Sequence, residues 1–403
     1  MNLLNYNYKI NIMDNPKNLN IDEFLTVGIR NNTKRRFLFI SKMLGKHLPC
    51  SPIKCDEEGK LLAYEYISKY GKGERTTVIG FAETATALGH SFFNYLPESL
   101  EYVHTTRENI QDEEFLEFNE EHSHAVGHKL YLGYLKSINI SDTVILVDDE
   151  ITTANTCINI INKIHKRYPK KKYIIASILN WVNEENMIKI YELEKKLNCQ
   201  IRFVYLFKGE FEFHVDEAQI NKYCEINSEV TEKINGNSNI EITYIHLNLD
   251  NYICNNKYIK YTGRFGIDKE DQIKLQEVIM RECEKIITEK DSKKLVLGTE
   301  EFMYIPMLFA KCIEGEVHFH STTRSPIIHC NQNNYDVKSK IQIKSYYNMD
   351  TVNYIYNTVD SDYDECFIFV ELKYNEKLDE DIFKMFRGSK VKKVTVVICN
   401  KEV

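Results

Sequence analysis

The chain has 403 residues, and because a typical domain has roughly 150 residues we expect two domains. A hydrophobic fraction of 43% and a charged fraction of 28% exclude a disordered or fibrous chain. The net charge of −7 excludes a global positive field that would attract nucleic acid or an anionic membrane. We therefore predict small-molecule substrates, with neither a nucleic-acid nor a membrane partner.

The opening segment and the cysteines together predict a cytoplasmic location. The first residues lack a basic start followed by an apolar run, and no later stretch approaches the roughly 18 apolar residues of a membrane span. The 11 cysteines include no C-x-x-C pair, which favours reduced thiols over a zinc ribbon or a disulfide framework.

The first predicted element is a helix over Thr33–His47, stopped by Pro49, because apolar residues recur there at helical spacing. A loop containing Pro52, Gly59 and Gly71 is expected to follow. Basic residues give the helix one charged face, which composition alone predicts to be solvated: Lys34, Arg35, Arg36, Lys42, Lys46 and His47.

Five apolar runs then predict buried strands, each followed by polar or helical sequence: Thr77–Gly80, Leu100–His104, Thr143–Val147, Tyr173–Leu179 and Arg202–Phe207. Strands that alternate with helical segments predict an α/β fold with a parallel sheet flanked by helices.

The sequence between about residues 208 and 256 is polar and rich in Asn, so we expect residues 1–212 and 256–403 to form two domains around a boundary region, 213–255. The second domain also reads as α/β, with a helix over Asp271–Thr288. Its predicted strands are Lys294–Gly298, Glu316–His320, Cys366–Glu371 and Lys393–Cys399.

The second half is interpreted as a diverged duplicate of the first. Val78–Glu83 matches Val296–Glu301 at Val, Gly and Glu, and a T-T-R triplet follows each after a further strand. Gly80 precedes Arg107 by 27 residues and Gly298 precedes Arg324 by 26. This predicts either a homodimer or an intrachain pseudo-dimer of the two halves.

The segment VILVDDEITTANT, Val144–Thr156, carries the strongest chemical signal. Amides at a helix start, with hydroxyls of neighbouring threonines, can hold a phosphate dianion. Asp148 and Asp149 would repel phosphate, so we expect them to accept from ribose hydroxyls, with Mg²⁺ held nearby on the ligand. An ordinary capped helix start is the structural alternative.

This segment resembles the phosphoribosyl pyrophosphate signature of type I phosphoribosyltransferases, except that the usual glycine is Ala154, whose methyl group disfavours positive φ. Together with GFAETATALGH, HTTRE and FNEEHSHAVGHKLY, it resembles the orotate-phosphoribosyltransferase-like proteins of tellurite-resistance and stress operons. In those proteins a domain named after its T-R-S-P motif follows the transferase, and here that motif is Thr323–Pro326.

The resemblance implies roles for three groups of residues in the first half. Asp148 and Asp149 would hold the ribose, and the 5′-phosphate would lie on Glu150, Thr152, Thr153, Ala154, Asn155 and Thr156. Pyrophosphate would lie on Ala82, Glu83, Thr84 and Ala85, with Arg107 as a cation near the leaving group. A plain strand-to-helix turn and a surface arginine are the structural alternatives.

A histidine-rich segment separates these motifs. By resemblance, His122, His124 and His128 belong to a loop that closes over the reaction centre, where at least one would act as an acid or hydrogen-bond donor. Solvated histidines or a zinc site are the alternatives. Replacing His124 by alanine would then lower turnover with little change in ligand affinity.

The second half has no equivalent of the paired acids, since Val370-Glu371-Leu372 stands where the first half has Val147-Asp148-Asp149. Its candidate residues either line a cleft of their own or serve packing: Glu300, Glu301, Thr322, Thr323, Arg324 and Ser325.

We expect a Mg²⁺-dependent phosphoribosyltransferase that uses phosphoribosyl pyrophosphate and an unidentified nitrogen base. Residues near the N terminus and around Trp181 or Phe211 are suspected to contact the base. A sensing module without turnover and an enzyme acting on nucleoside monophosphates are the alternatives.

Overall fold

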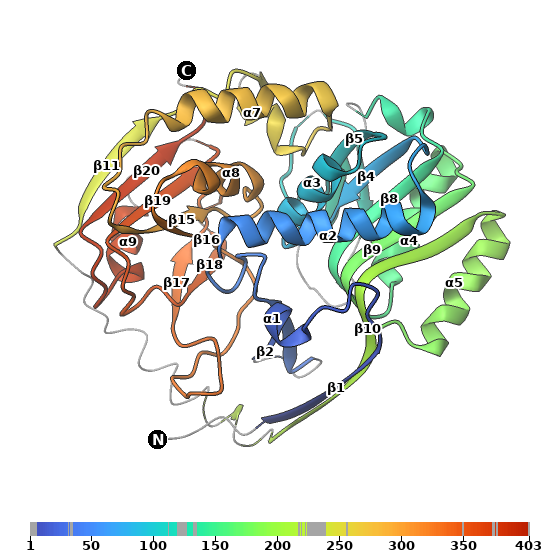
Figure 1. The fold of residues 1–403 in the computed structure, drawn as a ribbon, viewed down its shortest axis with the longest axis horizontal. Coiled ribbons are helices and arrows are strands. Elements are labelled where there is room, and N and C mark those ends of the chain that lie inside the picture. Colours follow the sequence, from blue (N-terminus) through green and yellow to red (C-terminus); the bar gives the residue numbers. More distant parts are fainter. Residues whose placement is uncertain are drawn as a thin grey trace.

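The computed structural model describes residues 6–30, 32, 35–111, 113–118, 127–131, 135–216, 218, 220, 221, 223, 239–254, 257–348, 350–372, 375 and 378–401. Two sheets lie side by side, each with helices on its faces; α2 runs across the centre of the view and α7 along its top (Figure 1). The described fold is α/β in both halves, as predicted.

The first sheet has the strand order β1-β10-β9-β8-β4-β5-β14. Its five central strands are parallel, whereas the edge strands β1 and β14 are antiparallel to their neighbours. The strands are β1 (Tyr6–Asp14), β4 (Thr76–Gly80), β5 (Ser99–His104), β8 (Thr143–Ile151), β9 (Lys172–Asn180), β10 (Gln200–Val215) and β14 (Ile267–Asp268). The five strands predicted for the first half are all present.

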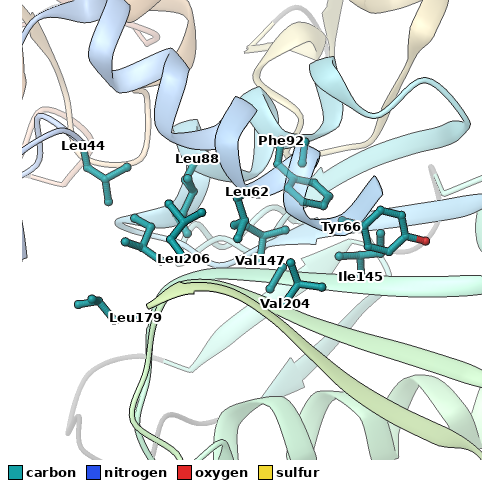
Figure 2. Packing of buried hydrophobic residues seen from close by; sticks show 14 of the residues in the cluster. Leu44, Leu62, Tyr66, Leu88, Phe92, Ile145, Val147, Leu179, Val204 and Leu206 are labelled. Carbon is teal, nitrogen blue, oxygen red and sulfur yellow. The ribbon is translucent and has the colours of Figure 1, made fainter. Parts of the chain in front are cut away.

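Helices α2 (Pro52–Tyr70) and α3 (Ala85–Tyr95) cover one face of this sheet, and α4 (Asn155–Arg167) and α5 (Glu184–Leu197) cover the other. The first face buries Leu62, Leu88 and Phe92 of the helices against Val147 and Val204 of the strands (Figure 2). Parallel strands with both faces covered explain the continuous apolar runs in the sequence.

The helix predicted over Thr33–His47 is wrong. Residues Phe37–Ser41 form strand β3, which pairs with β2 (Leu25–Ile29) after the short helix α1 (Ile21–Phe24). The residues beyond β3 form bends, and Gly45 has a φ of 67°, a left-handed conformation that interrupts a helix. Aromatic and β-branched side chains suit the paired strand better than a helix.

The loop predicted around Pro52, Gly59 and Gly71 is also wrong, because these residues lie in or beside helix α2. Pro52 occupies the first turn, where its missing N–H costs nothing. Gly59 lies where α2 crosses α3, and a Cβ there would be 2.5 Å from Cβ of Ser91. Gly71 caps the C terminus with a φ of 77°.

The second sheet has the order β11-β20-β19-β15-β16 and is entirely parallel. Its strands are β11 (Glu241–His246), β15 (Lys293–Gly298), β16 (Glu316–Ser321), β19 (Glu365–Val370) and β20 (Lys393–Ile398). In chain order, β15, β16, β19 and β20 take the same places as β4, β5, β8 and β9 in the first sheet. This shared order supports the interpretation of the second half as a duplicate.

Helices α7 (Lys269–Cys283), α8 (Tyr304–Cys312) and α9 (Asp379–Met385) pack on the second sheet. The remaining elements are β6 (Phe115–Phe118), β7 (His128–Tyr131), η1 (Ser137–Asn139), β12 (Tyr252–Ile253), β13 (Tyr258–Ile259), η2 (Lys260–Thr262), β17 (Lys340–Lys344) and β18 (Val352–Tyr356).

Short strands from and just after the predicted boundary region join both sheets. Strand β11 comes from the region 213–255 and joins the second sheet, where it pairs with β20. Strand β14 comes from the second half and joins the first sheet beside β5. In the part of the chain that the structure describes, no helix has the length and apolar character to cross a bilayer.

Glu58 of α2 predicts a specific dependence of stability on pH. Its buried carboxyl accepts from Ser41 Oγ at 3.0 Å, and burial raises its pKa from 4.5 to about 8. A raised folded-state pKa contributes stability below the unfolded pKa, and this contribution is lost as pH rises to about 8. The free energy of unfolding of Glu58→Gln should therefore rise relative to that of the wild type by about 1 kcal/mol per pH unit between pH 5 and 8.

Urea unfolding of the two proteins across this range measures the difference. Glu57→Gln is the matched control, because Glu57 is its exposed neighbour on the same helix. Parallel stability curves for wild type and Glu58→Gln would contradict the assignment.

Candidate functional site

Strand β8 carries the paired acids beyond the end of its neighbour β4. The last β4–β8 pair is Gly80 with Val147, whereas β8 continues beside β9 as far as Ile151. The strand predicted to end at Val147 thus includes Asp148 and Asp149, which are half-buried at the carboxyl edge of the sheet. Ligands of open parallel sheets bind at this edge.

The turn after β8 leads directly into helix α4. Thr152 and Thr153 are half-buried, and Thr153 Oγ1 accepts from the amide of Asn155 at 3.4 Å. Ala154 has a φ of 59°, so it takes the left-handed conformation despite its methyl group, and the turn here does not avoid positive φ. The first amides of α4 follow this turn, an arrangement suited to an anion.

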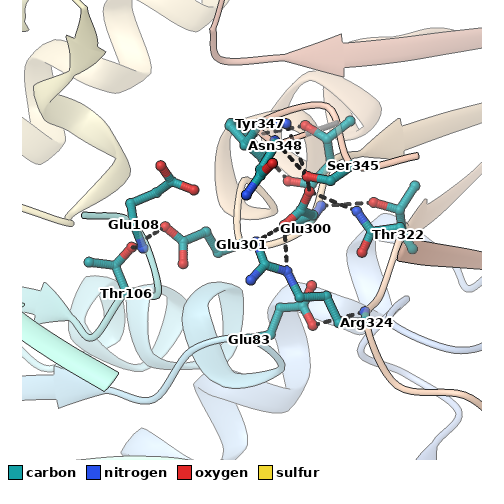
Figure 3. A network of polar contacts seen from close by, with 12 residues as sticks. Glu83, Thr106, Glu108, Glu300, Glu301, Thr322, Arg324, Ser345, Tyr347 and Asn348 are labelled. Atoms are coloured by element: carbon teal, nitrogen blue, oxygen red, sulfur yellow. Dashed lines mark hydrogen bonds and ion pairs between the residues drawn. The ribbon is translucent and has the colours of Figure 1, made fainter. Parts of the chain in front are cut away.

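The loop between β4 and α3 contributes Glu83. Its largely buried carboxylate lies 3.1 Å from Nζ of Lys46. It also accepts from the amide of Arg324 at 3.3 Å (Figure 3). Burial alone would raise its pKa, but Lys46, Arg107 and Arg324 together lower the pKa of Glu83 below its usual value. Glu83 is therefore an anion held among three cations.

A cavity of about 720 Å³ lies between these features and includes residues of both halves. From the first half it includes Ala82, Glu83, Thr84, Arg107, Asp148, Asp149, Glu150, Thr152, Thr153, Ala154, Asn155 and Thr156, and from the second half Thr323, Arg324 and Ser325. The structure thus brings the predicted ribose, phosphate and pyrophosphate residues to one cavity, together with the T-R-S-P segment.

The remaining predicted residues lie elsewhere. Ala85 begins α3 and is buried behind the cavity wall. His128 is buried on β7, with Nδ1 3.1 Å from Oγ1 of Thr105, which accepts from the Ala82 amide at 2.9 Å. His128 therefore does not line the cavity, and it acts on the Ala82 loop through Thr105. His122 and His124 lie outside the described residues. Among the described residues, no group of three or more potential ligands is arranged to hold a metal ion.

The N-terminal segment forms another part of the cavity wall, which includes Arg30, Asn32, Arg35, Leu38 and His47. Arg35 Nη2 donates to Glu150 at 2.5 Å. Burial followed by the charge of Lys46 lowers the pKa of His47 to about 3, so this ring is neutral at pH 7.

One expectation from the sequence fails for this wall, and the suspected base contacts stay a prediction. Lys46, Arg36 and His47 are buried rather than solvated, because residues 35–47 pack between the halves and not on an exposed helix. Trp181 and Phe211 pack with Phe39, at ring distances of 5.0 and 4.8 Å, and are not among the described residues of the cavity wall.

The corresponding place in the second half is filled by Arg264. Its guanidinium donates to Glu301 Oε1 at 3.0 and 2.8 Å and to both oxygens of Glu371 at 2.8 Å. Glu301 matches Glu83 in the repeat, and Arg264 is only 1% exposed. Ile368 pairs with Leu297 as Leu146 pairs with Ile79, so the strand register places Glu371 at the position of Asp149, one residue from the match with Asp148 predicted from the sequence. A protein cation therefore lies where the first half has its cavity. Sequence analysis missed Arg264, because no motif marks it.

A parallel sheet that ends in paired acids and a hydroxyl-rich helix start is typical of α/β proteins that bind phosphorylated ligands. Residues 24–210 match the family model described as phosphoribosyl transferase, and residues 261–386 match the TRSP domain that is C-terminal to this transferase. The match to the phosphoribosyltransferase family thus covers the first half of the chain, and the match to the TRSP domain lies in its second half.

Solved structures of adenine phosphoribosyltransferases are similar to part of the chain. The enzyme from Rhodothermus marinus is 14% identical, with 46% of this chain and 95% of that chain covered and a TM-score of 0.32. The enzyme from Giardia lamblia, complexed with 9-deazaadenine, is 15% identical, with 45% and 92% covered and a TM-score of 0.33. No curated protein matches the chain.

Replacing Arg264 by methionine should destabilise the fold by about 3–5 kcal/mol at pH 7, because two buried carboxylates would lose their cation. In the wild type, burial alone would raise the pKa of Glu301. Arg264 and His104 outweigh burial and lower this pKa from 4.5 to about 2. A depressed pKa contributes stability above pH 4.5 that is lost as pH falls toward 2, so the deficit of the variant should shrink in acid.

Denaturant unfolding at pH 7 and at about pH 3 measures both effects, because the contribution of Glu301 is lost below pH 4.5. Arg75→Met is the control, since Arg75 makes a comparable but exposed ion pair with Asp142. An Arg264→Met protein as stable as the control at pH 7 would show that the buried Arg264 guanidinium is not needed for the fold.

Proposed function

We propose that the first half transfers ribose 5-phosphate from phosphoribosyl pyrophosphate to a nitrogen base. One observation carries this proposal: the paired acids, the hydroxyl-rich start of α4, the Glu83 loop and Arg107 border a single cavity. Each group has a chemical counterpart in this ligand. The match of residues 24–210 to the phosphoribosyltransferase family supports the same reaction.

Asp148 and Asp149 would accept from the two ribose hydroxyls, which are the neutral donors of the ligand. The 5′-phosphate would lie against the amides and hydroxyls of Thr152–Thr156, at the positive end of α4. Anchoring both ends of the sugar fixes its C1 atom relative to Arg107 and the Glu83 loop, which is how positioning lowers the barrier.

In the reaction, the base nitrogen attacks C1 and forms the new C–N bond while the bond from C1 to the diphosphate oxygen breaks. The diphosphate leaves with the electron pair, and the proton that the base nitrogen loses passes to the diphosphate or to solvent. Arg107 would stabilise the charge on the departing diphosphate through its fixed guanidinium. Mg²⁺ bound to the diphosphate would supply further charge neutralisation, and the carboxylates of Asp148 and Asp149 are the oxygen donors suited to hold it nearby.

The double variant Asp148→Asn, Asp149→Asn should lose binding of phosphoribosyl pyrophosphate, because amides bind neither Mg²⁺ nor sugar hydroxyls as strongly as carboxylates. Calorimetry with Mg²⁺ present measures the affinity. Asp142→Asn is the control, since Asp142 is exposed and lies away from the cavity. Binding by the double variant with wild-type affinity would rule out this site.

Transfer itself can be tested by incubating the protein with phosphoribosyl pyrophosphate, Mg²⁺ and a panel of bases and measuring pyrophosphate release. We expect release with a subset of bases, and loss of a single charge-stabilising group such as Arg107 should slow it by about 10²–10³. Tight binding without release for any base would instead favour a sensing module.

A further inference from the structure

The two halves exchange equivalent contacts across their junction. Glu83 of the first half accepts from Thr323 Oγ1 at 3.5 Å and from the amide of Arg324. Glu301, its match in the second half, accepts from Thr106 Oγ1, and Thr106 is the match of Thr323 (Figure 3). The loops themselves are built alike, because Thr105 Oγ1 accepts from Ala82 N and Thr322 Oγ1 accepts from Glu300 N, both at 2.9 Å.

These exchanged contacts are those of a dimer with approximate two-fold symmetry, formed here within one chain. In such an arrangement each copy presents the same loop to the site of the other. The T-T-R loop of the second half consequently reaches the cavity of the first, where Thr323, Arg324 and Ser325 form part of the wall.

Arg324 is held in a defined orientation within that wall. Its Nε and Nη2 atoms both donate to Oε2 of Glu300, with an Nε distance of 2.8 Å. Glu300 is fixed in turn by Ser345 and by Asn353, whose Nδ2 donates at 2.7 Å. This pairing occupies one edge of the guanidinium and leaves the Nη1 edge for a second acceptor.

The charges around Glu83 identify the acceptor. Lys46, Arg107 and Arg324 all act on this carboxylate, while Glu300 and Glu301 act in turn on Arg324. Of these groups only Glu83, Arg107 and Arg324 line the cavity, so two cations face it beside one carboxylate. An oxyanion with several acceptor oxygens fits these two cations.

We infer that Arg324 of the TRSP half binds the diphosphate of phosphoribosyl pyrophosphate in the site of the first half. If the first half holds this ligand as proposed above, the second half acts as a built-in partner subunit, and the transferase site is incomplete without it. Arg264 occupies the equivalent place in the second half, so of these two places the one in the first half is open as far as the described residues show.

Arg324→Gln tests the inference by its selectivity among ligands. Calorimetry with Mg²⁺ should show phosphoribosyl pyrophosphate and inorganic pyrophosphate bound about tenfold more weakly or worse, the usual effect of losing a charged hydrogen bond. Ribose 5-phosphate, which lacks the diphosphate, should bind as it does to the wild type. Arg281→Gln is the control, because Arg281 lies on helix α7 of the same half, away from the cavity.

Arg324→Lys provides a second variant that keeps a cation beside Glu300 and is expected to fold. It should weaken diphosphate binding less than Arg324→Gln does, because it keeps the positive charge. Its affinity should still be below that of the wild type, since a lysine cannot bind bidentately. Wild-type affinity for phosphoribosyl pyrophosphate in both variants, or an equal loss for ribose 5-phosphate, would overturn the inference. A wild-type protein that does not bind phosphoribosyl pyrophosphate would contradict the proposed function itself.

Discussion

Two loop carboxylates, Glu83 and Glu301, connect the two halves, because each accepts a hydrogen bond from the opposite half. Glu83 accepts from the amide of Arg324, and Glu301 accepts from Thr106, while Lys46 and Arg264 supply each carboxylate with a cation from its own half. Buried carboxylates are costly without such partners. Because these hydrogen bonds join the two loops to the opposite halves, the junction and the candidate site share the same contacts.

The two copies have diverged in opposite directions from this shared frame. In the first half, Asp148 and Asp149 remain at the edge of a cavity, beside a hydroxyl-rich turn. In the second half, the single acid Glu371 is neutralised by Arg264, which is buried with it. A fixed internal cation thus occupies the place that in the first half is open to a ligand. What the second half presents to the cavity of the first includes the segment Thr323–Pro326.

The sequence predicted the strands well and the junction poorly, for physical reasons. Buried parallel strands such as Val144–Val147 are apolar throughout and stand out without any knowledge of their neighbours. The helix α2 was missed because Pro52 and Gly59 were interpreted as loop residues, although one suits a first turn and the other a close crossing with α3. Long-range packing decides such cases.

The candidate site was predictable where one segment carries several groups, as Val144–Thr156 does. It was not predictable where partners are distant in sequence, as with Arg264 and Glu371, which are separated by 107 positions. Lys46 is a similar case, since its burial depends on carbonyl oxygens of Glu300 and Thr322 in the other half. Such residues carry no local pattern that marks their role.

A crystal structure of the protein with phosphoribosyl pyrophosphate and Mg²⁺ bound would test the central claim most directly. One ligand per chain is expected, with its ribose at Asp148 and Asp149 and its diphosphate between Arg107 and Arg324. A second molecule bound in the TRSP half, or a diphosphate that does not contact Arg324, would contradict a single site completed by the second half.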